Sequence, residues 1–146
     1  MKGKECWKKV KGFEGYYEIR NRGRLRSDKR KVKRGSGFYH VPERIIKLWI
    51  GSVGYYQASL CKPGVKKTER IHRLVATHFH KNPENKPDVN HIDFDLLNNN
   101  DWNLEWVTTL ENFQHSEKSG RIYHRCNSKP LLCYDLKGAF IKKYIS

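Results

Sequence analysis

The pattern of apolar and charged positions predicts short β-strands at the start of the chain. Apolar and charged side chains alternate over 17–20 and over 24–27, as in strands with one buried face. The residues between them, Asn21-Arg22-Gly23, have the composition of a hairpin turn. We therefore expect a compact β unit over residues 7–27.

Further strands are predicted after this unit, separated by turns rich in glycine. Residues 28–43 are basic and rich in turn-forming residues, so we expect a mobile loop there. Residues 51–54, Gly-Ser-Val-Gly, have the composition of a turn. The strands predicted around these segments are 44–50, 55–61 and 65–71. They would form an antiparallel sheet with many Lys and Arg side chains on its outer face.

The spacing of the apolar residues changes from that of a strand to that of a helix after residue 71. Leu74, Val75 and His78 fall on one face of a helix predicted over 72–79. Two prolines then interrupt the chain before the next element.

The middle of the chain is predicted to be a strand–loop–strand–helix unit. The strands are 89–92 and 104–107, and the polar loop 93–100 ends in three asparagines. Residues 108–111, Thr-Thr-Leu-Glu, have the spacing of a helix capping box, and Gly120 lies where a helix would stop.

The tail, residues 129–146, is predicted to be a hairpin with its turn near 135–138. An antiparallel, β-rich N-terminal region, followed by a strand–loop–strand–helix unit and a short C-terminal hairpin, indicates the α+β class. By motif and composition, the chain divides into a β-rich N-terminal region, a central unit and a basic tail, over 1–70, 71–120 and 121–146.

Charge narrows the choice of function. The chain has 30 Lys and Arg residues against 15 Asp and Glu residues, a formal net charge of +15. The basic residues gather in 1–73 and in 116–146, whereas 74–115 is acidic. Two basic flanks around an acidic centre suggest that the flanks hold a polyanion, while the centre binds a cation or carries out chemistry. The alternative is that the acidic stretch is an ordinary solvated loop.

Composition excludes several other classes of protein. Hydrophobic residues make up 37% of the chain, enough for a modest core, which argues against wholesale disorder. No apolar run approaches the roughly 18 residues of a membrane span, and no apolar stretch follows the charged N-terminus. We therefore expect no membrane partner and no secretory signal, and we expect the four scattered cysteines to be reduced thiols.

Polar residues of the central unit form a pattern with catalytic potential. The spacing His91-x11-Asn103-x8-Asn112 places three polar side chains on consecutive elements that can converge. Asn112 and His115 share a face of the predicted helix. Asn90 and His91 are neighbours on a strand and point to opposite sides, so one could hold a metal while the other addresses a water.

This pattern resembles the HNH nuclease motif, the ββα-metal finger. Residues 71–76 (IHRLVA), 90–93 (NHID) and 103–108 (NLEWVT) together resemble the intron-encoded homing endonucleases of bacteriophages. Residues 7–24 are similar to the small modular domain that precedes the HNH unit in that family. The tail from 129 onwards resembles the start of another such module, which normally runs on into a helix-turn-helix.

The resemblance implies a role for each residue of the motif. His91 would be the general base that takes a proton from the attacking water, a role suited to an imidazole with a pKa near 6.5. Asn103 would tie the loop and so set the position of His91. Asn90 and Asn112 would hold the metal, with His115 either a further ligand or a phosphate contact. Outside this motif, His91 would be an ordinary strand histidine and Asn112 a surface amide.

Two features depart from the pattern of the family. Asn90 and Asn112 carry no formal charge, whereas many relatives have Asp or His at the first position. Such a pair suits one Mg²⁺ or Mn²⁺ ion per site better than zinc. Phe94 stands where the family often has glycine, so we expect a loop of different shape. Asp93 suits a loop cap as well as a ligand.

Basic side chains of the N-terminal region are the main candidate DNA contacts. A basic run can be merely a solvated segment, but with this net charge phosphate contact is favoured. The candidates are Arg20, Arg22, Arg24, Arg26, Lys29, Arg30, Lys31, Lys33, Arg34, Lys47, Arg73 and Arg121.

The resemblance therefore implies a metal-dependent endonuclease of the homing type. It would act as a monomer on double-stranded DNA, nicking or cutting a specific site, in the cytoplasm of a phage-infected bacterium. The expected products have 5′-phosphate and 3′-hydroxyl ends. Two other classes stay open, namely a DNA-binding protein with a decayed nuclease site and an intron-associated RNA-binding factor.

Overall fold

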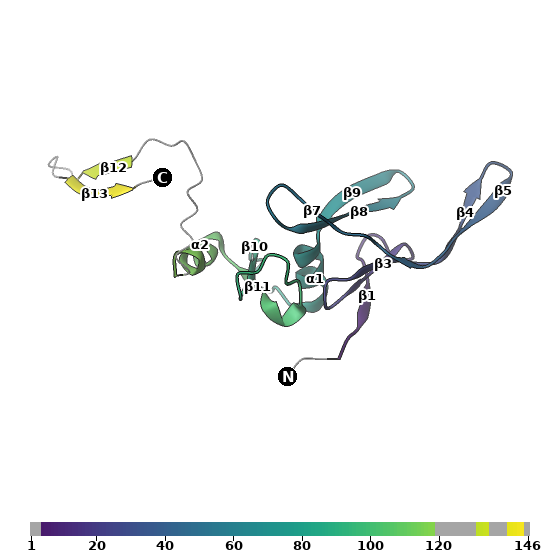
Figure 1. Cartoon of the computed structure of the whole chain (residues 1–146), viewed down its shortest axis with the longest axis horizontal. Helices are drawn as coiled ribbons and strands as arrows, with labels where there is room; N and C mark the ends of the chain where they lie inside the picture. Colours follow the sequence, from purple (N-terminus) through teal and green to yellow (C-terminus); the bar gives the residue numbers. More distant parts are fainter. Residues whose placement is uncertain (1–3, 119–130, 135–139, 145–146) are drawn as a thin grey trace. The chain divides into compact units, whose positions relative to one another are not determined.

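Short antiparallel strands and two α-helices make up the described part of the chain (Figure 1). The computed structural model describes residues 4–118, 131–134 and 140–144. The chain forms two compact units, Met1–Asn112 and Phe113–Ser146. Most of the described elements are strands and two are α-helices, so the predicted α+β class is confirmed at the level of its elements. Neither described helix is both long and apolar enough to cross a bilayer.

The hairpin predicted at the start of the chain is confirmed. Ile19 pairs with Leu25, and the backbone N–H of Gly23 donates to the carbonyl of Arg20 at 2.9 Å to close the turn. Ile19 and Leu25 are fully buried, as the alternating pattern requires. Two further strands complete a sheet of order β1-β2-β3-β6. Its strands are β1 (Trp7–Lys9), β2 (Tyr17–Arg20), β3 (Leu25–Ser27) and β6 (Arg44–Ile45).

The prediction of a mobile loop over 28–43 is wrong. This segment forms the hairpin of β4 (Arg30–Arg34) and β5 (Gly37–Val41). A tight turn joins the two strands, and Gly35 in it has a φ of 61°, a left-handed conformation that glycine adopts without steric cost. Both strands are almost entirely exposed. Because neither face is buried, no alternation of apolar and polar residues marks these strands in the sequence.

The single strand predicted over 44–50 is split between two sheets. β6 pairs with β3, whereas β7 (Trp49–Ile50) pairs with β8 (Tyr56–Lys62), so the chain crosses from one sheet to the next. β8 and β9 (Val65–Arg70) form the predicted hairpin, which gives a three-stranded sheet of order β7-β8-β9.

Helix α1 (Ile71–Phe79) joins these sheets into one core. Leu74 and Val75, on its predicted apolar face, are buried. His78 is half-buried: its Nδ1 lies 2.7 Å from the carbonyl oxygen of Leu74, and its Nε2 accepts from the backbone N–H of Lys11 at 2.9 Å. β2, β3, β8, β10 and β11 contribute to the same core. The boundary predicted at the start of this helix therefore lies inside one compact unit.

The strand–loop–strand–helix unit is present as predicted. Its capping box is reciprocal: the N–H of Thr108 donates to Oε2 of Glu111 at 2.7 Å, and the N–H of Glu111 donates to Oγ1 of Thr108 at 3.2 Å. The elements are β10 (Asp88–His91), the 3₁₀ turn η1 (Asp101–Asn103), β11 (Leu104–Val107) and α2 (Thr109–Lys118).

The predicted tail hairpin is confirmed in the second unit. β12 (Leu131–Tyr134) pairs antiparallel with β13 (Phe140–Tyr144). The predicted turn over 135–138, the helix stop at Gly120 and the candidate DNA contact Arg121 lie outside the described residues.

Candidate active site

His91 lies at the end of β10 in a cluster of aromatic rings. It pairs with Leu104 on β11 and is only 3% exposed. Its ring centroid is 5.9 Å from that of Tyr55, in a stacked arrangement, and 5.1 Å from that of His72, edge to face. Tyr55 immediately precedes β8 and His72 is the second residue of α1, so two segments distant in the sequence pack against the imidazole. The sequence did not predict a role for Tyr55, because a local pattern of residues does not show which turn packs against β10.

A contact with Asn99 selects the tautomer of His91. Oδ1 of Asn99 lies 3.5 Å from Nε2 of His91, and Nδ2 of Asn99 donates to the carbonyl of Leu97 at 3.0 Å. Because its amide nitrogen donates to a carbonyl, Asn99 presents its oxygen to the imidazole, and this contact favours the tautomer with the hydrogen on Nε2. Nδ1 then keeps the lone pair that a general base needs. The signal for Asn99 in the sequence was only its place in a run of three asparagines.

Burial favours the neutral form of His91. Desolvation lowers the pKa of His91 below its ordinary value, although the hydrogen bond with Asn99 and the carboxylates of Asp93 and Asp95 act in the opposite direction. A neutral imidazole is the form that can accept a proton from water. Burial therefore keeps His91 mainly in the neutral form at neutral pH.

Asn103 makes the loop-tying contacts that its expected role requires. Its Oδ1 accepts from the N–H of Asp93 at 3.0 Å, and its Nδ2 donates to Oδ1 of Asp93 at 2.8 Å and to the carbonyl of Asn98 at 2.9 Å. Its own carbonyl accepts from the N–H of Ile92 at 2.9 Å. These bonds hold the two residues that follow His91, so they constrain the end of β10.

Asp93 caps the loop that follows β10. Its carboxylate accepts from the N–H of Asp95 at 2.9 Å and from Nδ2 of Asn98 at 2.5 Å. Desolvation alone would raise the pKa of Asp93, but these bonds, together with that from Asn103, lower it. Phe94 has a φ of 63°. The backbone thus takes the left-handed conformation there even though glycine is absent.

Asn90 contacts a carboxylate that sequence reasoning did not assign to the site. Asn90 faces Glu105 across the β10–β11 ladder, and its Nδ2 donates to Oε1 of Glu105 at 2.9 Å. An amide oxygen is the atom of an asparagine side chain that could coordinate a hard cation. The register of the two strands, which the sequence did not reveal, creates this pair.

Asn112 lies near the start of α2, which is anchored at the first residue of β10. Oγ1 of Thr109 donates to Oδ2 of Asp88 at 2.9 Å. Asn112 is half-buried in the first compact unit. His115 is half-buried in the second unit, one helical turn further along α2.

The donor set at β10 suits a hard divalent cation. Among the described residues, no group of three or more His, Cys, Asp or Glu side chains could hold a metal ion. A site built on Asn90 and Asn112 would therefore use amide oxygens, which are ligands for Mg²⁺ and Mn²⁺ rather than for zinc. Glu105 places negative charge beside Asn90, where it would favour a bound cation.

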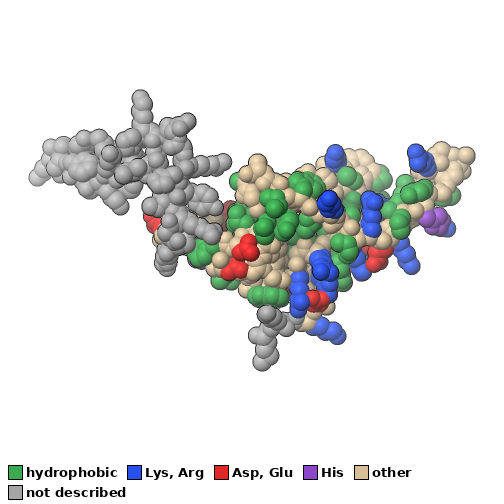
Figure 2. Space-filling model, viewed as in Figure 1, with side chains coloured by type: hydrophobic (Ala, Val, Ile, Leu, Met, Phe, Trp, Pro, Cys, Tyr) green, Lys and Arg blue, Asp and Glu red, His purple; other side chains and the backbone are tan. Residues whose placement is uncertain are grey.

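The candidate DNA contacts differ in whether their side chains have protein partners. Ion pairs or hydrogen bonds within the protein engage Arg20, Arg22, Arg26, Arg30 and Arg73. The side chains of another set are exposed and, within the described part of the chain, make no hydrogen bond or ion pair: Arg24, Lys29, Lys31, Lys33, Arg34 and Lys47. Lys and Arg side chains are also prominent over the N-terminal strands in Figure 2. The second set is the better placed to contact phosphates.

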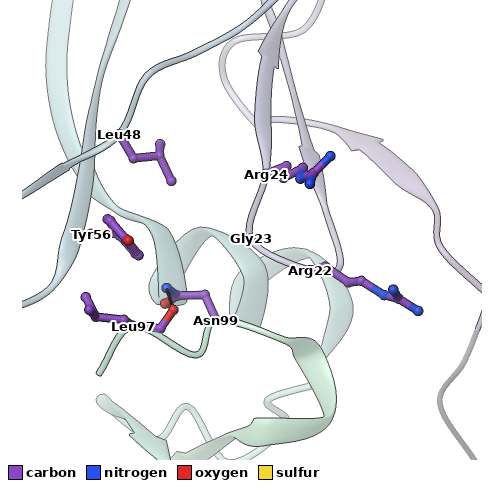
Figure 3. A pocket seen from close by; sticks show the side chains of 7 residues that line it. All are labelled: Arg22, Gly23, Arg24, Leu48, Tyr56, Leu97 and Asn99. Atoms are coloured by element: carbon purple, nitrogen blue, oxygen red, sulfur yellow. Dashed lines mark hydrogen bonds between the residues drawn. The ribbon is translucent and has the colours of Figure 1, made fainter. Parts of the chain in front are cut away.

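A cavity of about 370 Å³ opens beside the residue that contacts His91. Figure 3 shows the turn at Gly23 next to Asn99, with the side chain of Arg22 directed away from Asn99. The cavity is lined by Arg22, Gly23, Arg24, Leu48, Tyr56, Leu97 and Asn99.

A solved structure identifies the family. The HNH homing endonuclease I-HmuI, whose structure describes DNA binding and cleavage, matches with a TM-score of 0.66 at 32% sequence identity, over 95% of this chain and 77% of that one. This chain belongs to the HNH homing endonuclease family. The family predicted from the three sequence motifs is therefore confirmed.

Sequence relatives agree with this assignment. The NUMOD4 motif matches residues 5–61 of this family member. DNA endonuclease I-HmuI of Bacillus phage SP01 is 35% identical over 116 residues, which are 80% of this chain and 60% of that protein. The uncharacterized HNH endonuclease L245 of Acanthamoeba polyphaga mimivirus is 37% identical over 142 residues, which are 96% of this chain and 38% of that protein. The chain thus spans only part of the length of these curated relatives.

Proposed function

We propose that this protein is a divalent-metal-dependent DNA endonuclease of the homing type. The observation that carries the proposal is the state of His91, a buried imidazole whose Nε2 is held by Asn99 and whose Nδ1 keeps its lone pair. His91 directly follows Asn90 on β10, so the candidate base and a candidate metal ligand are consecutive residues of one strand. Family membership supports the proposal, because HNH endonucleases hydrolyse DNA.

His91 is the general base of the proposed reaction. Its Nδ1 takes a proton from a water molecule as the oxygen of that water attacks the scissile phosphorus. The contact of Nε2 with Asn99 and the charge of Asp93 both favour the imidazolium that forms. Asn103 keeps the loop after β10 in place throughout. The expected ends are a 5′-phosphate and a 3′-hydroxyl.

Asn90 and Asn112 would hold the divalent ion, with His115 as a further candidate. When bound, a single Mg²⁺ or Mn²⁺ ion would supply electrostatic stabilisation of the scissile phosphate and the departing 3′ oxygen. Glu105 orients Asn90 through its amide nitrogen. The phosphate of the DNA would complete the coordination of an ion whose protein ligands are largely neutral.

The N-terminal region would bind the duplex. The exposed hairpin of β4 and β5 is a two-stranded ribbon, a shape that the major groove of B-DNA accommodates. Its strands carry Lys31, Lys33 and Arg34, which are free to contact phosphates in the described structure. With one HNH unit in the described part of the chain, we propose a monomer that nicks one strand at each binding event.

The proposal is tested with a supercoiled plasmid that carries an intronless target sequence. We expect conversion to nicked or linear DNA with Mg²⁺ or Mn²⁺, and no conversion when EDTA is present. Binding of the verified target without cleavage by any divalent ion would instead favour a decayed nuclease site. Preferential binding of intron RNA over duplex DNA would favour an RNA-binding factor.

Replacing the carboxylate beside the metal ligand should weaken metal binding. In Glu105→Gln, we expect the Mg²⁺ concentration for half-maximal cleavage to rise about tenfold, because neighbours that orient a ligand typically change metal affinity by about 10- to 100-fold. The measurement is the initial nicking rate against Mg²⁺ concentration. Glu84→Gln removes the same charge from an exposed side chain and should leave the curve unchanged. Identical curves for the two variants would exclude this role of Glu105.

A further inference from the structure

We propose that the turn between β2 and β3, residues Asn21–Gly23, positions His91 by bracing the loop that carries Asn99. The proposal rests on the proposed function, since it takes His91 as the general base. The turn lies within the NUMOD4 match, whereas the loop lies in the HNH unit. The two are far apart in the sequence but meet in the first compact unit.

Gly23 is in direct contact with Asn99 (Figure 3). A Cβ atom at position 23 would lie 2.7 Å from Cβ of Asn99 and 3.3 Å from its carbonyl oxygen, and the φ of Gly23 is 76°. The first distance is shorter than real Cβ contacts allow, and both of its atoms are close to the backbone, so they cannot rotate apart. Only glycine lets the turn approach the loop this closely.

Asn21 holds the same loop two residues further on. Its carbonyl accepts from the N–H of Asp101 at 2.8 Å, and its Nδ2 donates to Oδ2 of Asp101 at 3.3 Å. Asn21 is 2% exposed, and its Oδ1 accepts from the N–H of Cys6 at 3.2 Å, so the asparagine is itself anchored. The turn therefore fixes the loop at Asn99 and at Asp101.

The contact between Asn99 and His91, which the turn maintains, is easily lost when Asn99 moves. Oδ1 of Asn99 lies 3.5 Å from Nε2 of His91, at the outer limit of a hydrogen bond. A displacement of Asn99 by a few tenths of an ångström would lose the bond, and the imidazole would no longer be held in the tautomer with Nδ1 as acceptor. The turn is thus a positioning element that acts on the reaction through Asn99.

Gly23→Ala and Gly15→Ala form a matched pair that tests this role. Gly15 has the same φ of 76°, but a Cβ there meets nothing within 4 Å, so Gly15→Ala carries the backbone strain without the collision. We expect Gly23→Ala to lower the single-turnover cleavage rate at saturating target DNA at least tenfold relative to Gly15→Ala. The Kd for the same DNA, measured without divalent ions, should agree within twofold. Equal rates, or an equal loss of DNA affinity, would overturn the proposal.

A double variant shows whether the turn acts through Asn99. Asn99→Ala should lower the cleavage rate as Gly23→Ala does, and the two changes together should lower it no further than Asn99→Ala alone. Multiplicative losses would mean that the turn acts by another route. If Gly23→Ala does not fold, Asn21→Ala loosens the same loop by removing the side-chain bond to Oδ2 of Asp101, and the same comparison applies.

The ring nitrogens of His91 give a readout that does not depend on cleavage. In ¹⁵N NMR at neutral pH, the wild type and Gly15→Ala should show His91 protonated at Nε2, and Gly23→Ala should show a mixture of both tautomers. A single unchanged tautomer in Gly23→Ala would overturn the proposal even if no DNA is cleaved. Absence of cleavage by the wild type, by contrast, would count against the proposed function alone.

Discussion

His91→Ala is expected to abolish most of the cleavage while DNA affinity is retained. The imidazole is the group proposed to take the proton from the attacking water, and general bases contribute rate factors of about 100 to 10,000. His91 is 3% exposed and lies on the HNH strand β10, away from the basic strands proposed to bind DNA. We therefore expect the single-turnover rate to fall by a factor in that range and the Kd for target DNA to stay within about threefold.

Three measurements decide this prediction. Single-turnover cleavage at saturating DNA and Mg²⁺ gives the rate, gel retardation in EDTA gives the Kd, and a thermal melt shows that the variant is folded. Cleavage at the rate of the wild type would exclude His91 as the base. A parallel loss of rate and affinity would mean that His91 supports the fold or the DNA interface rather than the chemistry.

Mild acid should destabilise the fold through His72. This residue is 2% exposed, and no hydrogen-bond partner reaches its Nδ1 in the described structure. Burial, with the nearby His91, Arg70 and Arg73, lowers the pKa of His72 to about 3. The unfolded chain binds a proton at this residue near pH 6.5, whereas the folded chain resists it, so the free energy of unfolding falls as the pH falls from 6.5 towards 3.

Urea titrations at a series of pH values measure this effect. One such group changes the free energy of unfolding by about 1.4 kcal/mol per pH unit within its window. His72→Phe keeps a ring beside Tyr55 and cannot be protonated, so its stability should depend less steeply on pH between 6 and 4.5. Asp93 and Glu111 also have lowered pKa values, but these carboxyl groups change the free energy of unfolding only below about pH 4.5. Both groups are still present in His72→Phe. Equal pH slopes for the two proteins would exclude a neutral, buried His72.

The local pattern of the sequence was sufficient for the elements of the HNH unit. The strands of β10 and β11, the capping box of Thr108 and Glu111, and the family itself followed from periodicity and motif. These features depend on residues that are close in the chain, where spacing determines which side chains meet. The hairpin of β4 and β5 was missed because strands exposed on both faces leave no apolar alternation.

The sequence did not predict the contacts around the candidate base. Tyr55 comes from the turn before β8, His72 from α1, and Asn99 from the loop after β10. Glu105 meets Asn90 only because the strand register places them opposite each other. In each contact, the positions of the two residues in the sequence do not show that they lie close together in the folded chain.

The sequence by itself determined the residues of the motif, the excess of positive charge and the order of the elements that carry them. The tertiary structure decided which nitrogen of His91 is free to accept a proton, which carboxylate stands beside Asn90, and which turn braces Asn99. The reason is physical: a motif specifies chemical groups, whereas the tautomer, the pKa and the position of a side chain depend on packing partners that only the folded chain brings together.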